Sequence, residues 1–200
     1  MIAIFDYGAG NLRSVQNTLG ELGCEYTLVR DRDGLRRASK ILLPGVGHFG
    51  QMMRALDALE VRQTLIERIA AGVPFLGICL GLQALFESSD EAPEVSGLGV
   101  FRGTVRRFPA TVRVPHMGWN ELAVTAPSAL VRCLNARPYV YFAHSYYVPR
   151  HEHASATCTY DVTYTAVLES RNVYGVQFHP EKSGPVGLQI VRNFLEMPPC

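Results

Sequence analysis

Hydrophobic residues in the first third of the chain alternate between short apolar runs and stretches with helical spacing. Apolar runs occupy residues 2–5, 26–29 and 41–43, and between the first two the leucines and valine of residues 12–22 recur every three or four positions. Such spacing predicts an amphipathic helix, and short apolar runs between helices are typical of buried parallel strands. The pattern therefore predicts the βαβ order of a parallel sheet.

The same alternation continues through the middle of the chain. Leu56, Leu59, Leu65 and Ile69 show helical spacing again, and the glycine at 72 followed by the proline at 74 marks the end of that helix. An apolar strand is predicted over residues 73–78, and a further strand-and-helix unit at 82–86.

From residue 100 onward the pattern changes to short β-rich pieces separated by prolines, glycines and aspartates. Strands are predicted at 103–108, 111–114, 139–142, 156–160 and 163–168, followed by a strand at 173–178 and a closing helix with one apolar face. We expect a three-layer α/β fold, with a mostly parallel central sheet flanked by helices and an additional antiparallel β portion. We also expect residues 1–200 to form a single domain.

Charge and hydropathy exclude several classes of protein. Lysine plus arginine number 19 against 18 for aspartate plus glutamate, so no strong field attracts nucleic acid or an anionic membrane. The most apolar stretch, residues 75–86, is too short for a membrane span of about 20 residues. A strand is predicted directly after Met1, which leaves no export signal, so we expect a cytoplasmic protein without nucleic-acid or membrane partners.

The five cysteines are an odd number, widely scattered and without a Cys-x-x-Cys pair. Free thiols are therefore expected, and neither the cysteines nor the histidines show the spacing of metal ligands. We expect no metal and no bound cofactor. Four of the cysteines lack any context that suggests chemistry: Cys24, Cys133, Cys158 and Cys200.

The fifth cysteine, Cys79, lies in the sequence Gly77-Ile78-Cys79-Leu80-Gly81, between an apolar strand and a predicted amphipathic helix. This is the Gly-x-nucleophile-x-Gly pattern in the context that it requires. Glycines permit the sharp turn, and helix N–H groups stabilise a thiolate. The alternative is a small buried cysteine flanked by glycines that serve close packing.

A candidate base follows at the end of the predicted strand 173–178, in the sequence His179-Pro180-Glu181. In an extended backbone, residues i and i+2 face the same side, so His179 and Glu181 can point together. A cysteine nucleophile needs a histidine to transfer protons, and the histidine needs a carboxylate to fix its tautomer. The combination favours catalysis by Cys79, His179 and Glu181.

These motifs resemble the class I, triad-type glutamine amidotransferases, whose signature is a Gly-x-Cys-x-Gly elbow followed much later by His-Pro-Glu. Further blocks resemble the glutaminase subunits of imidazole glycerol phosphate synthase. They span nearly the whole chain: Asp6-Tyr7-Gly8-Ala9-Gly10-Asn11, Pro44-Gly45-Val46-Gly47, His116-Met117-Gly118-Trp119-Asn120, Tyr141-Phe142-Ala143-His144-Ser145-Tyr146 and His179-Pro180-Glu181-Lys182-Ser183. One departure is Gly184-Pro185-Val186, where a polar residue is usual.

The resemblance implies hydrolysis of glutamine to glutamate and ammonia through a thioester on Cys79. It assigns the oxyanion-binding N–H groups to Gly47 and Leu80, although a Pro-Gly pair alone indicates only a turn. It also implies glutamine-binding residues, which are Gln83, Glu91, His144, Ser145 and Tyr146. Without the resemblance, Gln83 would be an ordinary helix residue and Glu91 part of a solvated acidic pair.

By the same resemblance, the partner is a (β/α)8 cyclase subunit that forms a heterodimer with this chain and uses the ammonia in histidine biosynthesis. The implied partner-facing residues are Asn11, Trp119, Tyr141 and Lys182; a tryptophan is also common in cores. Two alternatives remain open. One is the glutaminase subunit of pyridoxal phosphate synthase, and the other is a non-catalytic regulatory or scaffolding subunit.

Overall fold

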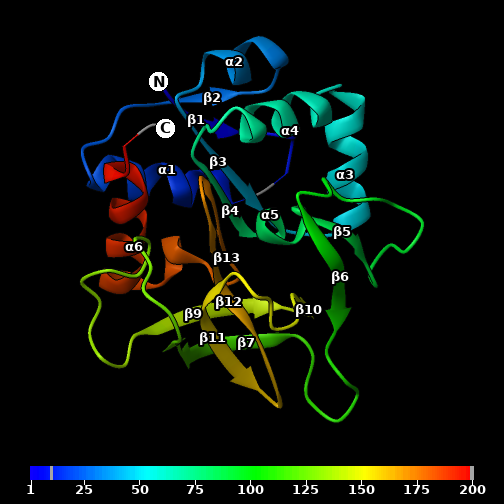
Figure 1. Cartoon of the computed structure of the whole chain (residues 1–200), viewed down its shortest axis with the longest axis vertical. Coiled ribbons are helices and arrows are strands. Elements are labelled where there is room, and N and C mark those ends of the chain that lie inside the picture. The colour runs from blue at the N-terminus through cyan, green and yellow to red at the C-terminus, as the bar shows by residue number, and fades with distance from the viewer. Residues whose placement is uncertain (10, 199–200) are drawn as a thin grey trace.

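An eight-stranded mixed sheet runs through the centre of the molecule (Figure 1). The computed structural model describes residues 1–9 and 11–198, so Gly10 and Cys200, both considered above, lie outside the described residues. The strand order is β2-β1-β3-β4-β13-β12-β11-β8; the first five strands are parallel and the rest pair antiparallel. The strands are β1 (Ile2–Phe5), β2 (Tyr26–Val29), β3 (Lys40–Gly45), β4 (Phe75–Cys79), β8 (Ala123–Val124), β11 (Ala154–Tyr160), β12 (Val162–Ser170) and β13 (Val173–Val176).

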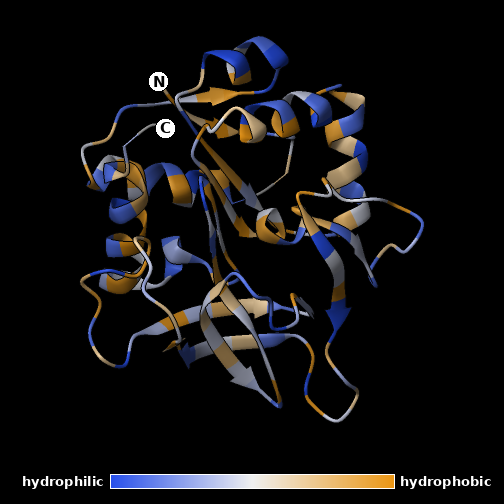
Figure 2. Ribbon diagram, in the orientation of Figure 1, coloured by the Kyte–Doolittle hydropathy of each residue, from blue (hydrophilic) through white to orange (hydrophobic). Residues whose placement is uncertain are grey.

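Helices cover both faces of this sheet, which confirms the predicted three layers (Figures 1 and 2). Successive strand residues point to opposite faces, so Leu42 belongs to one buried cluster while Ile41 and Leu43 belong to the other. Leu19 and Phe194 pack in the cluster of Leu42. The helices of that face are α1 (Leu12–Glu21) and α6 (Gly184–Glu196), and those of the other are α2 (Arg32–Arg37), α3 (Phe49–Ala58) and α4 (Arg62–Ala70).

Two smaller sheets lie outside the central one: in Figure 1, β6 runs along one side of the molecule, and β7 and β9 lie in its lower part. One consists of β10 (Tyr146–Tyr147), β6 (Phe101–Arg107) and β5 (Phe86–Ser89), and the other pairs β7 (His116–Glu121) with β9 (Tyr139–His144). Their residues face the carboxyl ends of β3 and β4 across a pocket. Ligands of open α/β sheets bind at this edge, so the smaller sheets complete a site there.

The helices differ from the sequence-based expectation in two places. The helical spacing from Leu56 to Ile69 belongs to two helices, because Glu60 adopts a left-handed backbone with φ 54° and ends α3. The N–H of Glu60 donates to the Asp57 carbonyl and that of Val61 to the Leu56 carbonyl, which is a Schellman cap. Helix α2 was not predicted, since it is mostly polar and only six residues long.

Two further predictions of local structure were wrong. Residues 111–114 form no strand; Val112 donates to the Pro109 carbonyl in a turn. The helix expected after Cys79 is α5 (Leu80–Gln83), which is only four residues long and buried on all sides rather than amphipathic. Apolar residues there indicate burial rather than one face of a surface helix.

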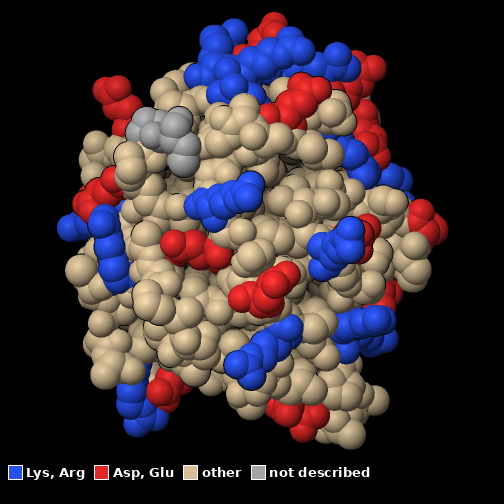
Figure 3. All heavy atoms as spheres, in the orientation of Figure 1, with Lys and Arg blue, Asp and Glu red and all other residues tan. Residues whose placement is uncertain are grey.

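No helix in residues 1–9 and 11–198 is long and apolar enough to cross a membrane. On the face in Figure 3, acidic and basic side chains lie interspersed, apart from a basic group over α2 that includes Arg36 and Arg37. The four cysteines of the described part of the chain are free, as expected. The same part contains no group of three or more histidine, cysteine, aspartate or glutamate side chains placed to hold a metal ion.

Candidate active site

Cys79 occupies a sharp turn between β4 and α5. Its backbone has φ 54° and ψ −105°, a conformation that is strained for a residue with a side chain. Close backbone approach explains the flanking glycines. A Cβ added to Gly77 would lie 2.5 Å from the Gly81 carbonyl oxygen, and one added to Gly81 would lie 1.9 Å from the Leu43 carbonyl oxygen. The turn therefore requires both glycines, and it holds the cysteine at the sheet edge.

This packing predicts a large loss of stability on Gly81→Ala. The added methyl collides with backbone of β3 that cannot move without breaking the sheet, so we expect a loss of about 3 kcal/mol or more in the free energy of unfolding. Gly20→Ala is the matched control, because a Cβ there meets nothing within 4 Å; it should be neutral or gain up to about 1 kcal/mol. Urea unfolding measures both, and equal midpoints for Gly81→Ala and wild type would contradict the packing argument.

His179 and Glu181 lie just after the end of β13. The His179 Nδ1 is 2.9 Å from the Glu181 Oε1, and the two side chains are only 4% and 2% exposed. Glu181 belongs to the 3₁₀ helix Pro180–Lys182, so the pair forms at a strand-to-helix turn rather than along a continuing strand as expected. The backbone of His179 is fixed because its N–H donates to the Tyr141 carbonyl.

The acid–base state of His179 reflects two opposing effects. Burial alone lowers the pKa of this imidazole, but hydrogen bonds and charge interactions with Cys79 and Glu181 outweigh burial and raise its pKa to about 10. At neutral pH His179 is therefore an imidazolium between a sulfur and a carboxylate. This arrangement can hold a thiolate and supply a proton to a leaving group.

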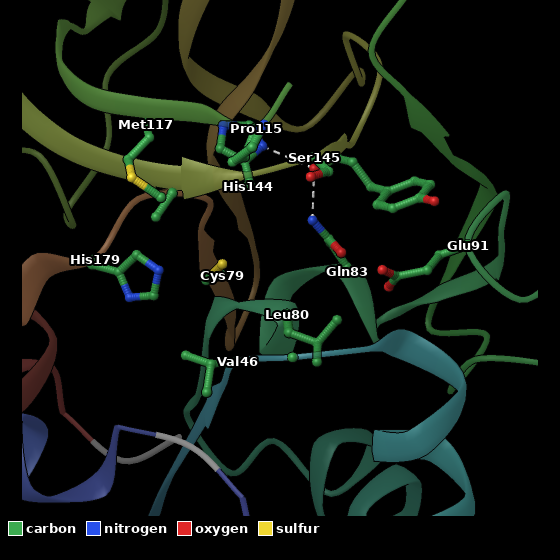
Figure 4. Close-up of a pocket in the computed structure, with 13 residues that line it drawn as sticks. Val46, Cys79, Leu80, Gln83, Glu91, Pro115, Met117, His144, Ser145 and His179 are labelled. Carbon is green, nitrogen blue, oxygen red and sulfur yellow. Dashed lines mark hydrogen bonds between the residues drawn. The ribbon is translucent and has the colours of Figure 1, made fainter. Parts of the chain in front are cut away.

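A pocket of about 170 Å³ lies in front of Cys79 and His179 (Figure 4). All the other predicted oxyanion and glutamine-binding residues line it: Gly47, Leu80, Gln83, Glu91, His144, Ser145 and Tyr146. Glu181 does not; it stands behind His179. Val46, Pro115, Met117 and Ala143 also line the pocket and were not predicted, since nothing in residues of these types points to a ligand.

Gln83 and Glu91 face each other across one side of the pocket, and both have protein partners (Figure 4). The Gln83 Nε2 donates to the Tyr146 carbonyl at 2.8 Å and to the Gln177 Oε1 at 3.1 Å, so its oxygen is the end left for a ligand. One oxygen of Glu91 accepts from the N–H of Phe49 at the start of α3. Both side chains are thus held in place before any ligand binds.

The ring of His144 takes part in a buried network. Its Nδ1 lies 2.8 Å from the Tyr146 carbonyl, which can only accept, so Nδ1 carries the proton and Nε2 accepts from the Tyr164 hydroxyl at 3.3 Å. The Tyr164 oxygen in turn accepts from the His116 Nδ1 at 3.2 Å. With both ring nitrogens engaged, His144 positions the neighbouring segment rather than offering its ring to a ligand.

This network predicts a loss of stability in mild acid. Burial lowers the pKa of His116 to about 4 and that of His144 to about 3, below the value near 6.5 in an unfolded chain. Between those values the unfolded chain binds more protons, so stability falls as pH falls below about 6.5. From pH 7 to pH 5 each histidine should cost about 2 kcal/mol in the free energy of unfolding.

Urea unfolding at the two pH values tests this expectation. His116→Phe keeps a ring against Tyr160 and Phe142, where the His116 ring now stacks, but removes one titrating group. The two histidines together lower the free energy of unfolding at pH 5, and in the variant this decrease should be about half as large. If the free energy of unfolding falls as much between pH 7 and pH 5 in His116→Phe as in wild type, His116 does not cause the loss of stability in acid.

The last residue of β3 and the segment that follows it lie against the elbow. A Cβ on Gly45 would be 2.8 Å from the Leu80 Cβ, and Gly47 adopts φ 96°, which favours glycine. The hydroxyl of Tyr7 lies 3.3 Å from both the N and the O of Val46, and burial raises the pKa of Tyr7 to about 12. Tyr7 thus anchors this segment as a neutral phenol, a contact that sequence reasoning missed.

The predicted partner-facing residues fall into two groups. Trp119 is 56% exposed on β7 and contacts the ring of Tyr141 on β9, over which the Lys182 ammonium lies 5.8 Å from the ring centroid. Asn11 instead points inward, and its Nδ2 is 3.4 Å from the Glu181 Oε1. Trp119, Tyr141 and Lys182 therefore form one exposed cluster, whereas Asn11 contacts the carboxylate behind His179.

The chain is similar to known proteins over nearly its whole length. The class-I glutamine amidotransferase model matches residues 3–197, and the chain belongs to that family. A crystal structure of a glutamine amidotransferase superposes with a TM-score of 0.77 at 22% identity, covering 98% of this chain and 97% of the other. PurLQS from Thermotoga maritima gives a TM-score of 0.76 at 21% identity, covering 97% and 96%. At identities this low, the two structures show only that this chain shares their fold.

Within that family, the chain is similar to curated proteins called imidazole glycerol phosphate synthase subunit HisH. The relative from Methanothermobacter thermautotrophicus is 47% identical over 198 residues, which cover 98% of each chain. The relative from Geobacillus kaustophilus is 45% identical over 203 residues, covering 98% of this chain and 96% of the relative. That from Methanocaldococcus jannaschii is 41% identical over 198 residues, covering 98% and 100%.

Proposed function

We propose that this chain is the glutaminase subunit of an imidazole glycerol phosphate synthase, acting in histidine biosynthesis as a single cytoplasmic domain. The observation that carries the proposal is the strained Cys79 elbow that shares a pocket with His179, whose ring is paired with the buried Glu181 behind it. The names of relatives at 41–47% identity support the particular synthase, and they do not favour the pyridoxal phosphate synthase alternative.

In the proposed reaction, the Cys79 thiolate attacks the side-chain carbonyl of glutamine, and the C–N bond breaks as His179 gives its proton to the leaving amide nitrogen, which departs as ammonia. Water then adds to the glutamyl thioester; His179 takes a proton from that water, and the C–S bond breaks to release glutamate. N–H groups of Gly47 and Leu80 stabilise the oxyanion of each step. Glutamine and water thus yield glutamate and ammonia, without any metal or cofactor.

The same pocket accounts for the binding of glutamine. The carboxylate of Glu91 and the free oxygen of Gln83 suit the ammonium of the substrate, since both accept hydrogen bonds. Ser145 and the backbone of the His144–Tyr146 segment, held by the buried histidine network, suit its carboxylate. These side chains come from three separate parts of the chain, which meet only in the fold.

Ammonia must reach a second enzyme, and we propose a (β/α)8 cyclase that docks over the pocket mouth to form a heterodimer. Met117, Trp119, Tyr139 and Tyr141 lie on the same face of the β7–β9 sheet, because alternate residues share a face. Met117 also lines the pocket and is 66% exposed. Apolar side chains at the mouth of a catalytic pocket favour a docking surface, and the exposed Lys182 ammonium beside them suits a carboxylate of the partner.

Glutamine hydrolysis tests the proposal, measured for wild type and Cys79→Ala, each alone and with a purified cyclase subunit carrying its ligand. Partner-stimulated turnover that disappears in Cys79→Ala supports it. Trp119→Ala should lose most of the stimulation, whereas Leu28→Ala, an exposed apolar residue on β2, should keep it. No turnover in any wild-type mixture would favour a non-catalytic subunit.

A further inference from the structure

Gln177 is a fully buried amide that contacts the nucleophile. It follows β13, its side chain is 0% exposed, and its Nε2 donates to the Cys79 Sγ at 3.7 Å. Its Oε1 accepts from the Gln83 Nε2 at 3.1 Å. Burial of a primary amide is unfavourable unless both ends are paired, and here both ends are. The partners are a reacting atom and a residue of the pocket.

The chain of hydrogen bonds fixes which end of Gln177 faces the sulfur. The Tyr146 carbonyl can only accept, so it requires the NH₂ end of Gln83, and the second hydrogen of that NH₂ requires an oxygen on Gln177. The NH₂ end of Gln177 is then directed at Cys79. Turning this amide over would set two donors together at Gln83 and place an oxygen against a thiolate.

We propose that Gln177 is a catalytic residue whose amide N–H stabilises and orients the Cys79 thiolate, and that Gln83 links this donor to the substrate-binding segment at Tyr146. The inference rests on the proposed function, in which the sulfur is the nucleophile. A hydrogen bond to an ionised acceptor is about twice as strong as a neutral one, and burial strengthens it further. The contact therefore favours the thiolate over the thiol.

Each half of the reaction uses this donor. The thiolate that attacks glutamine loses its charge as the C–S bond forms, and it regains that charge when water breaks the thioester. The Gln177 N–H holds the sulfur in one direction in the resting state and receives the returning charge. Because Gln83 also binds the Tyr146 carbonyl, a shift of the substrate-binding segment reorients the donor.

Several other titratable groups lie around Cys79 and also affect its reactivity. His179 faces the sulfur with Glu181 behind it. Tyr7, in the segment after β1, and Tyr164 on β12 also interact with Cys79. Glu91 lines the same pocket. Replacing Gln177 alone removes none of these groups, so the variant tests the contribution of the amide to the reactivity of Cys79.

The experiment measures the rate at which iodoacetamide alkylates Cys79 in the full chain from pH 5 to 10, followed on the peptide that carries Cys79. In Gln177→Met, which keeps the side-chain volume without the amide, the pH of half-maximal rate should rise by about one unit. The kcat for partner-stimulated glutamine hydrolysis should fall about tenfold, with KM changed less than threefold. Gln83→Met should shift the midpoint in the same direction by a smaller amount.

Gln63→Met is the matched control, because Gln63 is exposed on α4 and its side-chain amide donates to Glu67, away from the pocket. Its alkylation midpoint should equal that of wild type. Gln177→Glu provides a second test if Gln177→Met folds poorly. It has the same shape but sets an acceptor against the sulfur, so its midpoint should rise further than one unit.

The results separate the two claims. An unchanged Cys79 midpoint in folded Gln177→Met or Gln177→Glu, with normal wild-type turnover of glutamine, would overturn the role of Gln177 and leave the proposed function intact. If wild type with its cyclase partner hydrolyses no glutamine, the proposed function itself fails.

Discussion

Replacing Cys79 with serine is expected to lower kcat for partner-stimulated glutamine hydrolysis by about 10⁴-fold or more. The site holds an imidazolium, with the pKa of His179 raised to about 10, next to the sulfur. This ion pair suits a thiolate, whereas a serine hydroxyl is a much weaker acid than a thiol and does not ionise beside the histidine. Release of glutamate from glutamine, measured with the cyclase partner present, checks the result.

Cys133→Ser is the control for this substitution, since Cys133 is an exposed thiol away from the pocket. It should keep wild-type turnover, and both variants should unfold at the urea concentration of wild type. Turnover of Cys79→Ser within tenfold of wild type would mean that another group is the nucleophile.

The second large effect is expected for Glu181→Gln, which should reduce kcat by about 10²–10⁴-fold. Its carboxylate accepts from the His179 Nδ1 and thereby fixes the tautomer that faces Cys79. An amide at that position can donate to Nδ1 and favours the wrong tautomer, and loss of the negative charge lowers the pKa of His179 from its raised value. The pH profile of kcat should therefore lose activity at its alkaline end.

Glu67→Gln, an exposed substitution on α4, serves as the comparison for Glu181→Gln and should leave the pH profile unchanged. Retention of at least a third of the wild-type kcat in Glu181→Gln, with an unshifted alkaline limb, would show that the carboxylate has no part in proton transfer.

Local patterns predicted the sheet and the main chemical groups because their causes are local. Apolar runs are buried strands, and the glycines around Cys79 are required by the turn itself, where a Cβ on Gly81 would meet the Leu43 carbonyl. The proximity of His179 and Glu181 follows from a separation of two residues, although a 3₁₀ turn rather than a strand brings them together.

Contacts between distant parts of the chain could not be predicted from local sequence patterns. Gln177 reaches Cys79 across 98 positions, and the Tyr164 hydroxyl joins two histidines from other strands. Both Gln177 and Tyr164 are fully buried polar side chains, and burial of a polar group indicates a partner without identifying it. The break at Glu60 was also missed, because a left-handed glutamate is not favoured by local preference.

The central claim is that glutamine passes through a thioester on Cys79, and acid quenching during turnover tests it most directly. Wild type mixed with glutamine and the cyclase partner, stopped in acid and digested, should yield the Cys79 peptide carrying a glutamyl group that mild base removes. Glutamate formation without that adduct in repeated early time points, or an adduct on a different cysteine, would contradict the account.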